Sequence, residues 1–406
     1  MDQSTRAGTF AALRSRDFRL FWGGQTVSLA GDGAFMVAMG WRVVDLTGHA
    51  SSLAILLLLQ STAMLATLLI GGALADRYSR KALMILSDLA RAAVVAVLAA
   101  ADATGHLSFG LWVALAILFG LGDGFFIPAF GGMLPLVVEQ PYLASANALI
   151  GVSRNMSFVI GPALAGFLYH GVGSPVVFAL EAGTFVFSAG LLALARPRVF
   201  EREPSEGTWR EIVAGARYVT GVPWLWITVS LSSLAIMVAW APFQSLLPKL
   251  VQLHFHRGPA SYGSLFSAQA VGMVAGALLF GRLQPRGNRV LIAYTAWAVN
   301  DLCAIAVALV GSYDLAVALI AARGIFVGFA NALWETVLVE LVPERMLSRV
   351  SSLDFFGALG LTPVGYALAA GVAGFFSPSV IISAGFAFAF VLWAVPLSVR
   401  RVRSAG

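Results

Sequence analysis

The chain has 406 residues, of which 59% are hydrophobic and 11% are charged, and its formal net charge is +6. Its mean hydropathy is +0.85. Soluble domains carry about 25% charged residues, so this composition excludes a water-soluble globule. Apolar runs of about 18 or more residues, which are typical of transmembrane helices, recur along the whole chain. The composition therefore predicts an all-α membrane protein.

The hydrophobic pattern predicts twelve membrane-spanning helices. In chain order they are expected at roughly 18–45, 50–75, 81–102, 107–137, 142–170, 175–196, 222–252, 260–281, 289–311, 314–341, 346–374 and 378–399.

Only the connection from Pro197 to Gly221 is long. Its apolar residues recur at helical spacing with charged residues between them, which is typical of an amphipathic helix on a membrane surface. We therefore expect an N-terminal six-helix bundle at residues 1–196, a cytoplasmic linker with an amphipathic helix at 197–221, and a C-terminal six-helix bundle at 222–406.

The distribution of basic residues predicts the orientation, because cytoplasmic loops are enriched in Arg and Lys. If the N-terminus is cytoplasmic, 20 of the 26 basic residues lie in cytoplasmic segments, and only Arg42, Lys249 and Arg257 lie in segments on the outer side. The remaining three, Arg91, Arg154 and Arg323, lie within spans. Both termini are therefore expected in the cytoplasm. The basic residues are interpreted as topology signals and lipid-headgroup contacts, not as a nucleic-acid surface.

A shift of 204 residues superposes short stretches of the two halves. Gly72 then falls on Gly276, Gly124 on Gly328, and Gly161 on Gly365. Each match is weak alone, but the common offset indicates an internal repeat. Two repeated bundles can enclose a site near the bilayer midplane and rock about it.

The stretch GGALADRYSRK, at residues 71–81, places four charges directly after a long apolar run. It resembles motif A of the major facilitator superfamily, a Gly-x-Leu-Ala-Asp-Arg-x-Gly-Arg-Arg/Lys pattern. The matching residues are Gly72, Leu74, Ala75, Asp76, Arg77, Arg80 and Lys81, whereas Ser79 replaces the second glycine. The resemblance implies the major facilitator fold, with twelve transmembrane helices in two pseudo-symmetric six-helix bundles.

The same resemblance implies that this loop is a cytoplasmic gate. In that family the Asp meets the N-terminal end of the eleventh helix, where a carboxylate is favoured by about 0.3–1 kcal/mol. The expected partner here is the segment from Met346 to Asp354, with Asp354 pairing with the basic residues of the motif. The alternative is a plain topology signal with no gating role.

A second resemblance concerns SFVIGPALAG, at residues 157–166, which is similar to motif C, the antiporter motif Gly-x-x-x-Gly-Pro-x-x-Gly-Gly. Gly161, Pro162 and Gly166 match. In the family this motif marks exporters. The stretches 16–48 and 122–149 resemble the branch that contains enterobactin exporters and macrolide efflux pumps.

Ionisable groups inside membrane spans are costly and usually functional. Asp32 in the first span and Asp123 in the fourth each lie between two glycines, which we expect to leave the carboxylates uncrowded. The resemblance implies that these two spans line the cavity. A desolvated carboxylate there can hold or release a proton near neutral pH, so both are predicted proton-coupling residues. The alternative for each is a structural role.

The other ionisable groups have weaker assignments. Asp88 and Arg91, three residues apart, are expected to form a structural pair. Arg323 faces either the cavity or a buried acid, Asp301 or Glu335. Arg154 and Glu181 could pair within the first half. Whether Arg154, Glu181 and Asp301 are functional or structural stays open at this point.

Aromatic and polar side chains within the spans suit a large, mostly apolar substrate held by few hydrogen bonds. The residues predicted to line the substrate cavity are Gln25, Trp41, Phe126, Trp240, Gln244, Arg323, Asn331 and Trp334.

Two function classes follow. The first is a secondary active exporter of amphipathic small molecules (drug, macrolide or siderophore-like), coupled to protons by antiport and alternating access. The second is a facilitator-fold lysophospholipid flippase or a non-transporting membrane sensor. The chain has no Gly-x4-Gly-Lys-Ser/Thr loop and no His-Glu-x-x-His motif, so we expect no enzyme activity, cofactor or metal. The expected state is a monomer in the bacterial inner membrane.

Overall fold

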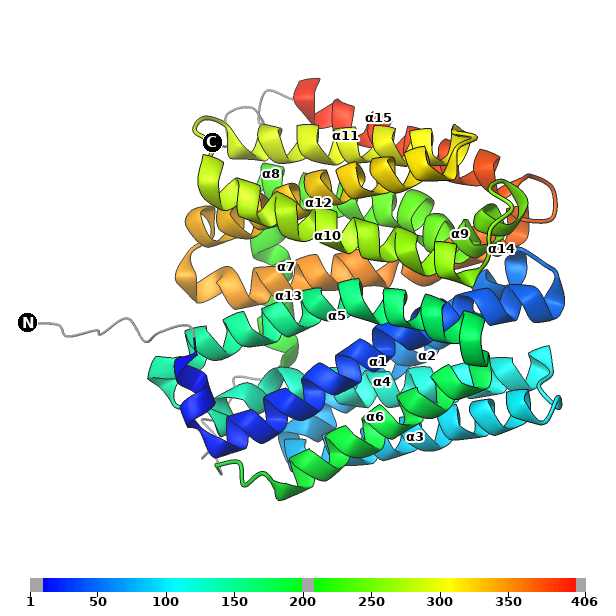
Figure 1. Cartoon of the computed structure of the whole chain (residues 1–406). Helices are drawn as coiled ribbons and strands as arrows, with labels where there is room; N and C mark the ends of the chain where they lie inside the picture. The colour runs from blue at the N-terminus through cyan, green and yellow to red at the C-terminus, as the bar shows by residue number, and fades with distance from the viewer. Residues whose placement is uncertain (1–9, 199–207, 399–406) are drawn as a thin grey trace, which may run out of the picture. The chain divides into compact units, whose positions relative to one another are not determined.

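The computed structural model describes residues 10–198 and 208–398. Within these ranges every regular element is a helix (Figure 1). The elements before the long connection are η1 (Ala11–Arg14), α1 (Arg16–Thr47), α2 (Ser51–Arg77), α3 (Arg80–Ala103), α4 (Phe109–Val137), η2 (Gln140–Tyr142), α5 (Leu143–Val172) and α6 (Ser174–Leu194). Those after it are α7 (Thr208–Gly221), α8 (Pro223–Ala235), η3 (Ile236–Trp240), α9 (Ala241–Leu253), α10 (Pro259–Leu283), α11 (Arg289–Leu309), α12 (Tyr313–Leu341), α13 (Glu344–Gly360), α14 (Thr362–Val372) and α15 (Pro378–Ser398).

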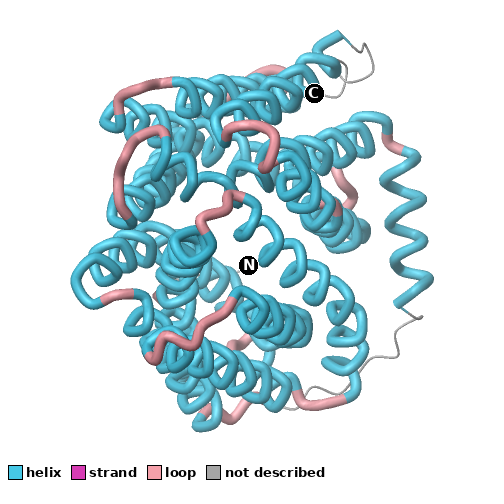
Figure 2. Tube along the Cα trace, turned by 90° about the vertical axis from the view of Figure 1, so that its right-hand side faces the viewer, coloured by secondary structure: helices cyan, strands magenta, loops and turns pink. Residues whose placement is uncertain are grey.

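The membrane-spanning helices predicted from hydropathy correspond to helices of the structure. In the described residues, 11 helical stretches are long and apolar enough to cross a membrane, and Pro378–Ala394 is a shorter apolar helix. Figure 2 shows that short loops connect most of them. The chain is thus a multi-pass, all-α membrane protein, as its composition predicts.

The span expected at 222–252 contains an irregularity. Its middle, η3, is a π-helical turn between α8 and α9. Pro242 follows this turn and has no N–H for the carbonyl of Val238. A Cβ at Gly385 of α15 would collide with that carbonyl, and one at Gly365 of α14 with the carbonyl of Met237. Glycines therefore let two helices pack directly against the widened turn.

The span expected at 346–374 is built from two helices. α13 ends at Gly360 and α14 begins at Thr362, with Pro363 in its first turn. Proline is tolerated in a first turn but cannot donate to the backbone of the preceding one. The sequence pattern does not predict this break, because both pieces are apolar.

Contacts divide the chain into two units. Unit 1 is Met1–Thr47 with Leu59–Arg202, and unit 2 is Gly48–Leu58 with Glu203–Gly406. The boundary at residue 202 falls inside the predicted linker, 197–221. The segment Gly48–Leu58, which contains the start of α2, belongs to unit 2. The predicted boundaries at 196 and 222 place this segment in the N-terminal bundle instead.

The predicted amphipathic helix of the linker is α7, described from Thr208 onwards. Its Gly215 lies against α13: a Cβ there would be 3.1 Å from Cβ of Arg349 and 3.2 Å from Cδ1 of Leu353. α7 thus packs on a helix of its own unit, a contact that helical spacing alone does not reveal.

Glycines related by the 204-residue shift occupy equivalent positions in the two units. A Cβ at Gly120 of α4 would collide with the carbonyl of Gln60 on α2, and a Cβ at Gly324 of α12 would collide with that of Gln269 on α10. Gly161 of α5 similarly touches α1, and its counterpart on α14 touches η3. The same close helix approaches recur in both halves, which agrees with an internal repeat.

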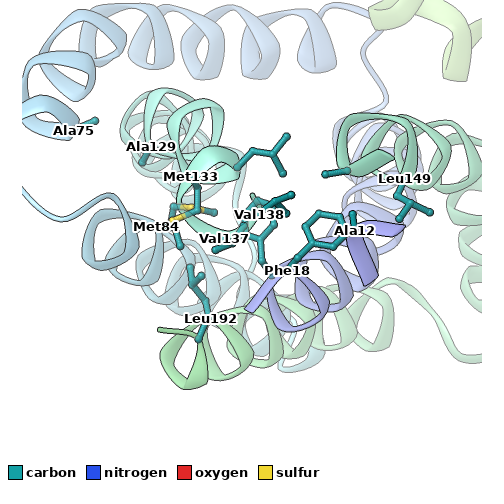
Figure 3. Packing of buried hydrophobic residues seen from close by; sticks show 14 residues of the cluster. Ala12, Phe18, Ala75, Met84, Ala129, Met133, Val137, Val138, Leu149 and Leu192 are labelled. Carbon is teal, nitrogen blue, oxygen red and sulfur yellow. The ribbon is translucent and has the colours of Figure 1, made fainter. Parts of the chain in front are cut away.

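A cluster of buried hydrophobic side chains closes one end of unit 1 (Figure 3). It joins the start of α1 to the ends of α2 and α4 and the start of α3: Phe18, Ala75, Met84 and Met133 are at most 5% exposed. Ala75 belongs to the motif A stretch, so this is the expected cytoplasmic end.

An ion-pair network ties the opposite end of unit 1. Arg42 of α1 donates from Nε to Oδ1 of Asp102 on α3 at 2.8 Å. The other carboxylate oxygen accepts from Ser174 at the start of α6. The Asp102 side chain is 1% exposed. Three helices are therefore connected through one buried carboxylate.

Candidate functional site

Asp32 lies in α1 at a point where α5 and α6 both approach closely. A Cβ at Gly31 would lie 2.7 Å from Oγ1 of Thr184 on α6 and would collide with Oε2 of Glu181. A Cβ at Gly33 would lie 2.8 Å from the carbonyl oxygen of Ser157 on α5. The expectation that these glycines leave Asp32 uncrowded is wrong, because they are packing positions.

Asp123 of α4 has the same local design. A Cβ at Gly122 would lie 2.9 Å from Cγ of Arg91 on α3, and one at Gly124 would lie 2.6 Å from the carbonyl oxygen of Met64 on α2. Each Gly-Asp-Gly triplet therefore locks its helix between two neighbours. The backbone on either side of each aspartate is closely packed, which corrects the expectation of a pliable, open backbone.

Arg91 is the centre of a charged cluster in unit 1. Its Nη2 lies 2.5 Å from Oδ1 of Asp88, and its Nη1 lies 3.0 Å from Oδ1 of Asp123. The guanidinium carbon also lies 4.2 Å from the ring centroid of Phe126 and 4.4 Å from that of Phe185. The expected pair of Asp88 and Arg91 is present, and it extends to a predicted proton-coupling residue on another helix.

Asp88 is held more firmly than Asp123. Its side chain is fully buried, and Oδ2 accepts from Ser188 of α6 at 2.9 Å. Ser188 in turn accepts from Gln25 of α1 at 2.8 Å. Gln25 is therefore part of a network inside unit 1, and a role in lining the substrate cavity stays a prediction. The Asp123 side chain is 19% exposed, the most accessible end of this network.

Glu181 of α6 completes the cluster. It is 1% exposed, and its Oε2 accepts from Thr184 at 2.9 Å. Its Oε2 lies against the α1 backbone at Gly31, next to Asp32, and the charge of Asp32 acts on it. The alternative partner, Arg154, is exposed on α5, and no ion pair joins the two among the described residues. Sequence reasoning left Glu181 undecided because α1 and α6 are far apart in the chain.

The charges of this cluster do not balance. Four carboxyls, on α1, α3, α4 and α6, act on one guanidinium: Asp32, Asp88, Asp123 and Glu181. Uncompensated charge is strongly disfavoured in a low-dielectric interior. This cost falls when some of the carboxyls are protonated.

Unit 2 contains one comparable arginine. Arg323 of α12 is 3% exposed and donates to Oε1 of Gln269 at 2.5 Å. Its guanidinium carbon lies 4.7 Å from the ring centroid of Phe243 and 5.2 Å from that of Trp240. The charge of Asp301, which is 3% exposed, acts on Arg323, but no ion pair joins the two among the described residues, so both alternatives for Arg323 stay predictions.

The other residues predicted to line the cavity have varied surroundings. Trp41 is 7% exposed, and Gln244 accepts from Tyr366 at 2.6 Å. Asn331 is exposed and accepts from Trp297 at 3.3 Å. Trp334 donates to Oδ2 of Asp354 at 3.1 Å. These contacts lie within single units, so which of them meet substrate stays a prediction.

The basic residues of motif A bind backbone carbonyls within unit 1. Arg80 donates to the carbonyl of Gly132 on α4 at 2.6 Å. Lys81 donates to the carbonyls of Ala193 and Ala195, at the end of α6, at 2.7 and 2.8 Å. A cation is favoured at a helix C-terminus. The motif thus ties the expected cytoplasmic ends of three helices.

Ser79, which departs from the motif A pattern, caps α3. Its hydroxyl accepts from the N–H of Ala82, and its φ of −63° requires no glycine. Gly72 has open space around it, and Arg77 is exposed. The side chain of Asp76 lies outside the described residues, so its gate role stays a prediction.

Motif C packs α5 against α1 beside Asp32. A Cβ at Gly161 would lie 2.7 Å from the carbonyl oxygen of Ala30, and Cδ of Pro162 lies 3.3 Å from the Cβ position of Gly33. Gly161 and Pro162 are buried, as is Gly166 one turn further along. The stretch that resembles motif C and the predicted proton site therefore share one helix contact.

Two helical units with a repeated packing pattern, and a charged cluster inside the spans, define a polytopic membrane transporter. The sequence model of the Major Facilitator Superfamily matches residues 21–353. The chain belongs to this superfamily.

Characterised relatives include exporters. Macrolide efflux protein A of Streptococcus pyogenes is 25% identical over 363 residues, covering 87% of this chain and 88% of that protein. Enterobactin exporter EntS of Citrobacter koseri is 28% identical over 378 residues, covering 89% and 86%. A bacterial homologue of the iron transporter ferroportin, in an inward-facing state, matches with a TM-score of 0.71 and 15% identity over 94% of this chain and 98% of that one, which shows the fold alone. The chain is therefore a transporter with efflux homologues, not an enzyme.

Proposed function

We propose that the chain exports amphipathic small molecules from the cytoplasm in exchange for protons, by alternating access. The observation that carries this proposal is the cluster of four carboxyls around Arg91 in unit 1. An antiporter needs a group that loses its proton when substrate binds and regains it on the other side. A cluster with more carboxyls than cations provides such a group.

The accessibility of the carboxyls supports a division of roles. Asp88 is fully buried and bonded to both Arg91 and Ser188, so it serves as the fixed counter-ion. Asp123, with 19% of its side chain exposed, and the half-buried Asp32 can be reached by water. These two exchange protons with the cavity.

The relatives support the proposed substrate class. One is a macrolide efflux protein and the other an enterobactin exporter. Macrolides and siderophores are large molecules with both apolar and polar surface. We propose a substrate of this kind for the present chain, with aromatic side chains such as Trp240 and Trp334 providing apolar contact.

The orientation and the gate form the second part of the proposal. Both termini lie in the cytoplasm of a bacterial cell, in its inner membrane, and the end of unit 1 that carries Ala75 faces the cytoplasm. Asp76 closes this side against the start of α13 in the outward-open state. The bonds of Arg80 and Lys81 to backbone carbonyls support this, since they hold the start of α3 directly after the end of α2, which contains Asp76.

Everted membrane vesicles test the proposed function. Vesicles with the wild-type chain should accumulate a labelled macrolide, or enterobactin, when their lumen is acidic. A protonophore should abolish this uptake, and a sodium gradient should not replace the proton gradient. Uptake that follows the sodium gradient, or that ignores both gradients, would contradict proton coupling.

A further inference from the structure

The close contact between α1 and α6 has a specific chemical consequence. Because residue 31 has no side chain, the carboxyl of Glu181 can lie directly against the α1 backbone, next to Asp32. The charges of the two carboxyls act on each other. An ionised carboxylate only accepts hydrogen bonds, so two neighbouring carboxyls can bond to each other only through a proton held between them.

The hydrogen-bond partners of Glu181 point to the same conclusion. Its Oε2 accepts from the hydroxyl of Thr184, which also bonds the carbonyl of residue 181. Its Oε1 is buried and receives no hydrogen bond from any donor in the described part of the chain. A buried carboxylate oxygen without a donor is costly, whereas a shared proton satisfies it.

The charged groups around Asp32 and Glu181 are two further carboxyls and one guanidinium. Arg91 and Asp88 act on the pair from α3, and Asp123 acts on it from α4. Where α5 packs on α1, the contacting groups are backbone atoms of Ser157 and Gly161, which carry no charge. Arg154 of α5 is exposed. Arg91 already binds Asp88 and Asp123 directly. The single guanidinium is thus committed elsewhere, and the pair needs its own neutralising charge.

We propose that Asp32 and Glu181 hold one proton in common, and that this shared proton is the one exchanged during transport. Glu181 is then a second proton-coupling residue, on a helix far from α1 in sequence. The exchange of this proton during transport rests on the proposed function, whereas the sharing rests on the α1–α6 contact at Gly31 and the unpartnered Oε1 of Glu181. Arg91 keeps Asp88 as its ionised partner throughout.

Infrared difference spectroscopy of the purified full chain in lipid tests the sharing without any substrate. Protonated carboxyls have a carbonyl stretch that ionised carboxylates lack. Spectra taken between about pH 5 and about pH 9 should contain a band that disappears in Glu181→Gln and, equally, in Asp32→Asn, since either amide can donate to the remaining carboxylate. Glu139→Gln, an exposed residue with the same change, should leave the band intact.

A third variant keeps every carboxyl. In Gly31→Ala the new methyl group would push the Glu181 carboxyl away from Asp32, so the shared band should shift or split although no acid is lost. Chromatographic behaviour and thermal unfolding check that each variant is folded. Two separate bands, one lost in each amide variant, would overturn the shared proton, as would a band that neither variant changes.

Transport then separates this inference from the proposed function. Glu181→Gln should lose macrolide or enterobactin uptake driven by an acidic lumen, while Glu139→Gln keeps it. Wild-type vesicles with no proton-driven uptake, but with the shared band present, would refute only the proposed function. Full proton-driven uptake by Glu181→Gln would refute the role assigned here and leave proton coupling standing.

Discussion

Arg91 of α3 and Asp123 of α4 form an ion pair, with 3.0 Å between Nη1 and Oδ1. The pair joins two helices inside the membrane-spanning part of unit 1, and the same guanidinium also holds Asp88. One cation is therefore responsible for both the packing and the charge state of the cluster.

Removing this cation should be severely destabilising. Arg91→Gln would leave two carboxylates without their partner, and breaking a buried ion pair from one side costs about 3–5 kcal/mol. Thermal unfolding of the purified protein in detergent should show a large drop in the transition temperature. Arg154→Gln, which changes an exposed arginine on α5, is the matched control and should have little effect. Equal stability of the two variants would mean that the cluster does not hold the helices together.

The repeated glycine contacts give a second prediction. Gly120→Ala and Gly324→Ala should both destabilise, because each new methyl group would collide with a backbone carbonyl, at Gln60 and Gln269 respectively. Gly183→Ala is a control in α6, with nothing within 4 Å of its Cβ position. That change should stabilise the helix by about 0.5–1 kcal/mol. A neutral result at either tight glycine would contradict the close helix approach described there.

The orientation is testable by labelling with a thiol reagent that does not cross membranes. In a Cys303→Ser background, a cysteine at Arg257 should react from outside intact cells, and one at Tyr78 should react only in everted vesicles. Both positions are exposed, so access depends on the side of the membrane. The reverse pattern would invert the topology and the gate.

The gate predicts a variant that changes transport without unfolding the chain. Asp76→Asn should weaken closure of the cytoplasmic side, lower transport and leave the amount of folded protein almost unchanged. Lys81→Met is a useful contrast, because it removes two bonds to the end of α6 and should reduce stability as well. Thiol accessibility of the cavity from the cytoplasm measures closure. Wild-type transport and accessibility in Asp76→Asn would reduce the motif to a topology signal.

The sequence predicts much of this molecule because hydropathy and basic residues report directly on membrane spans. The expected spans, the linker helix and the repeat all have counterparts in the structure. Breaks such as the π-turn after Ala235 and the gap at Leu361 are not predicted, because an apolar run has the same appearance with or without them. Packing glycines look identical to flexible ones in sequence, so the sequence does not predict the close packing around Asp32.

The sequence predicts the individual charged residues of the site more readily than it predicts which of them contact one another. Asp32, Asp88, Arg91 and Asp123 each stand out as charges within spans. Which of them meet depends on how α1, α3, α4 and α6 pack, and helices separated by a hundred residues leave no periodic signal of their contact. The role proposed for Glu181 depends on its contact with the α1 backbone at Gly31, and only the structure gives this contact.

Proton-driven accumulation of a labelled macrolide or enterobactin in everted vesicles, measured in parallel for Asp32→Asn, Asp123→Asn and the exposed control Asp314→Asn, tests proton coupling through this cluster most directly. Asp32→Asn fixes the uncharged form of the site. It should abolish uptake driven by an acidic lumen while still allowing downhill exchange of substrate, and Asp314→Asn should match the wild type. If only Asp123→Asn fails, the proton site lies on α4. Full gradient-driven uptake by both Asp32→Asn and Asp123→Asn would contradict proton coupling through the cluster.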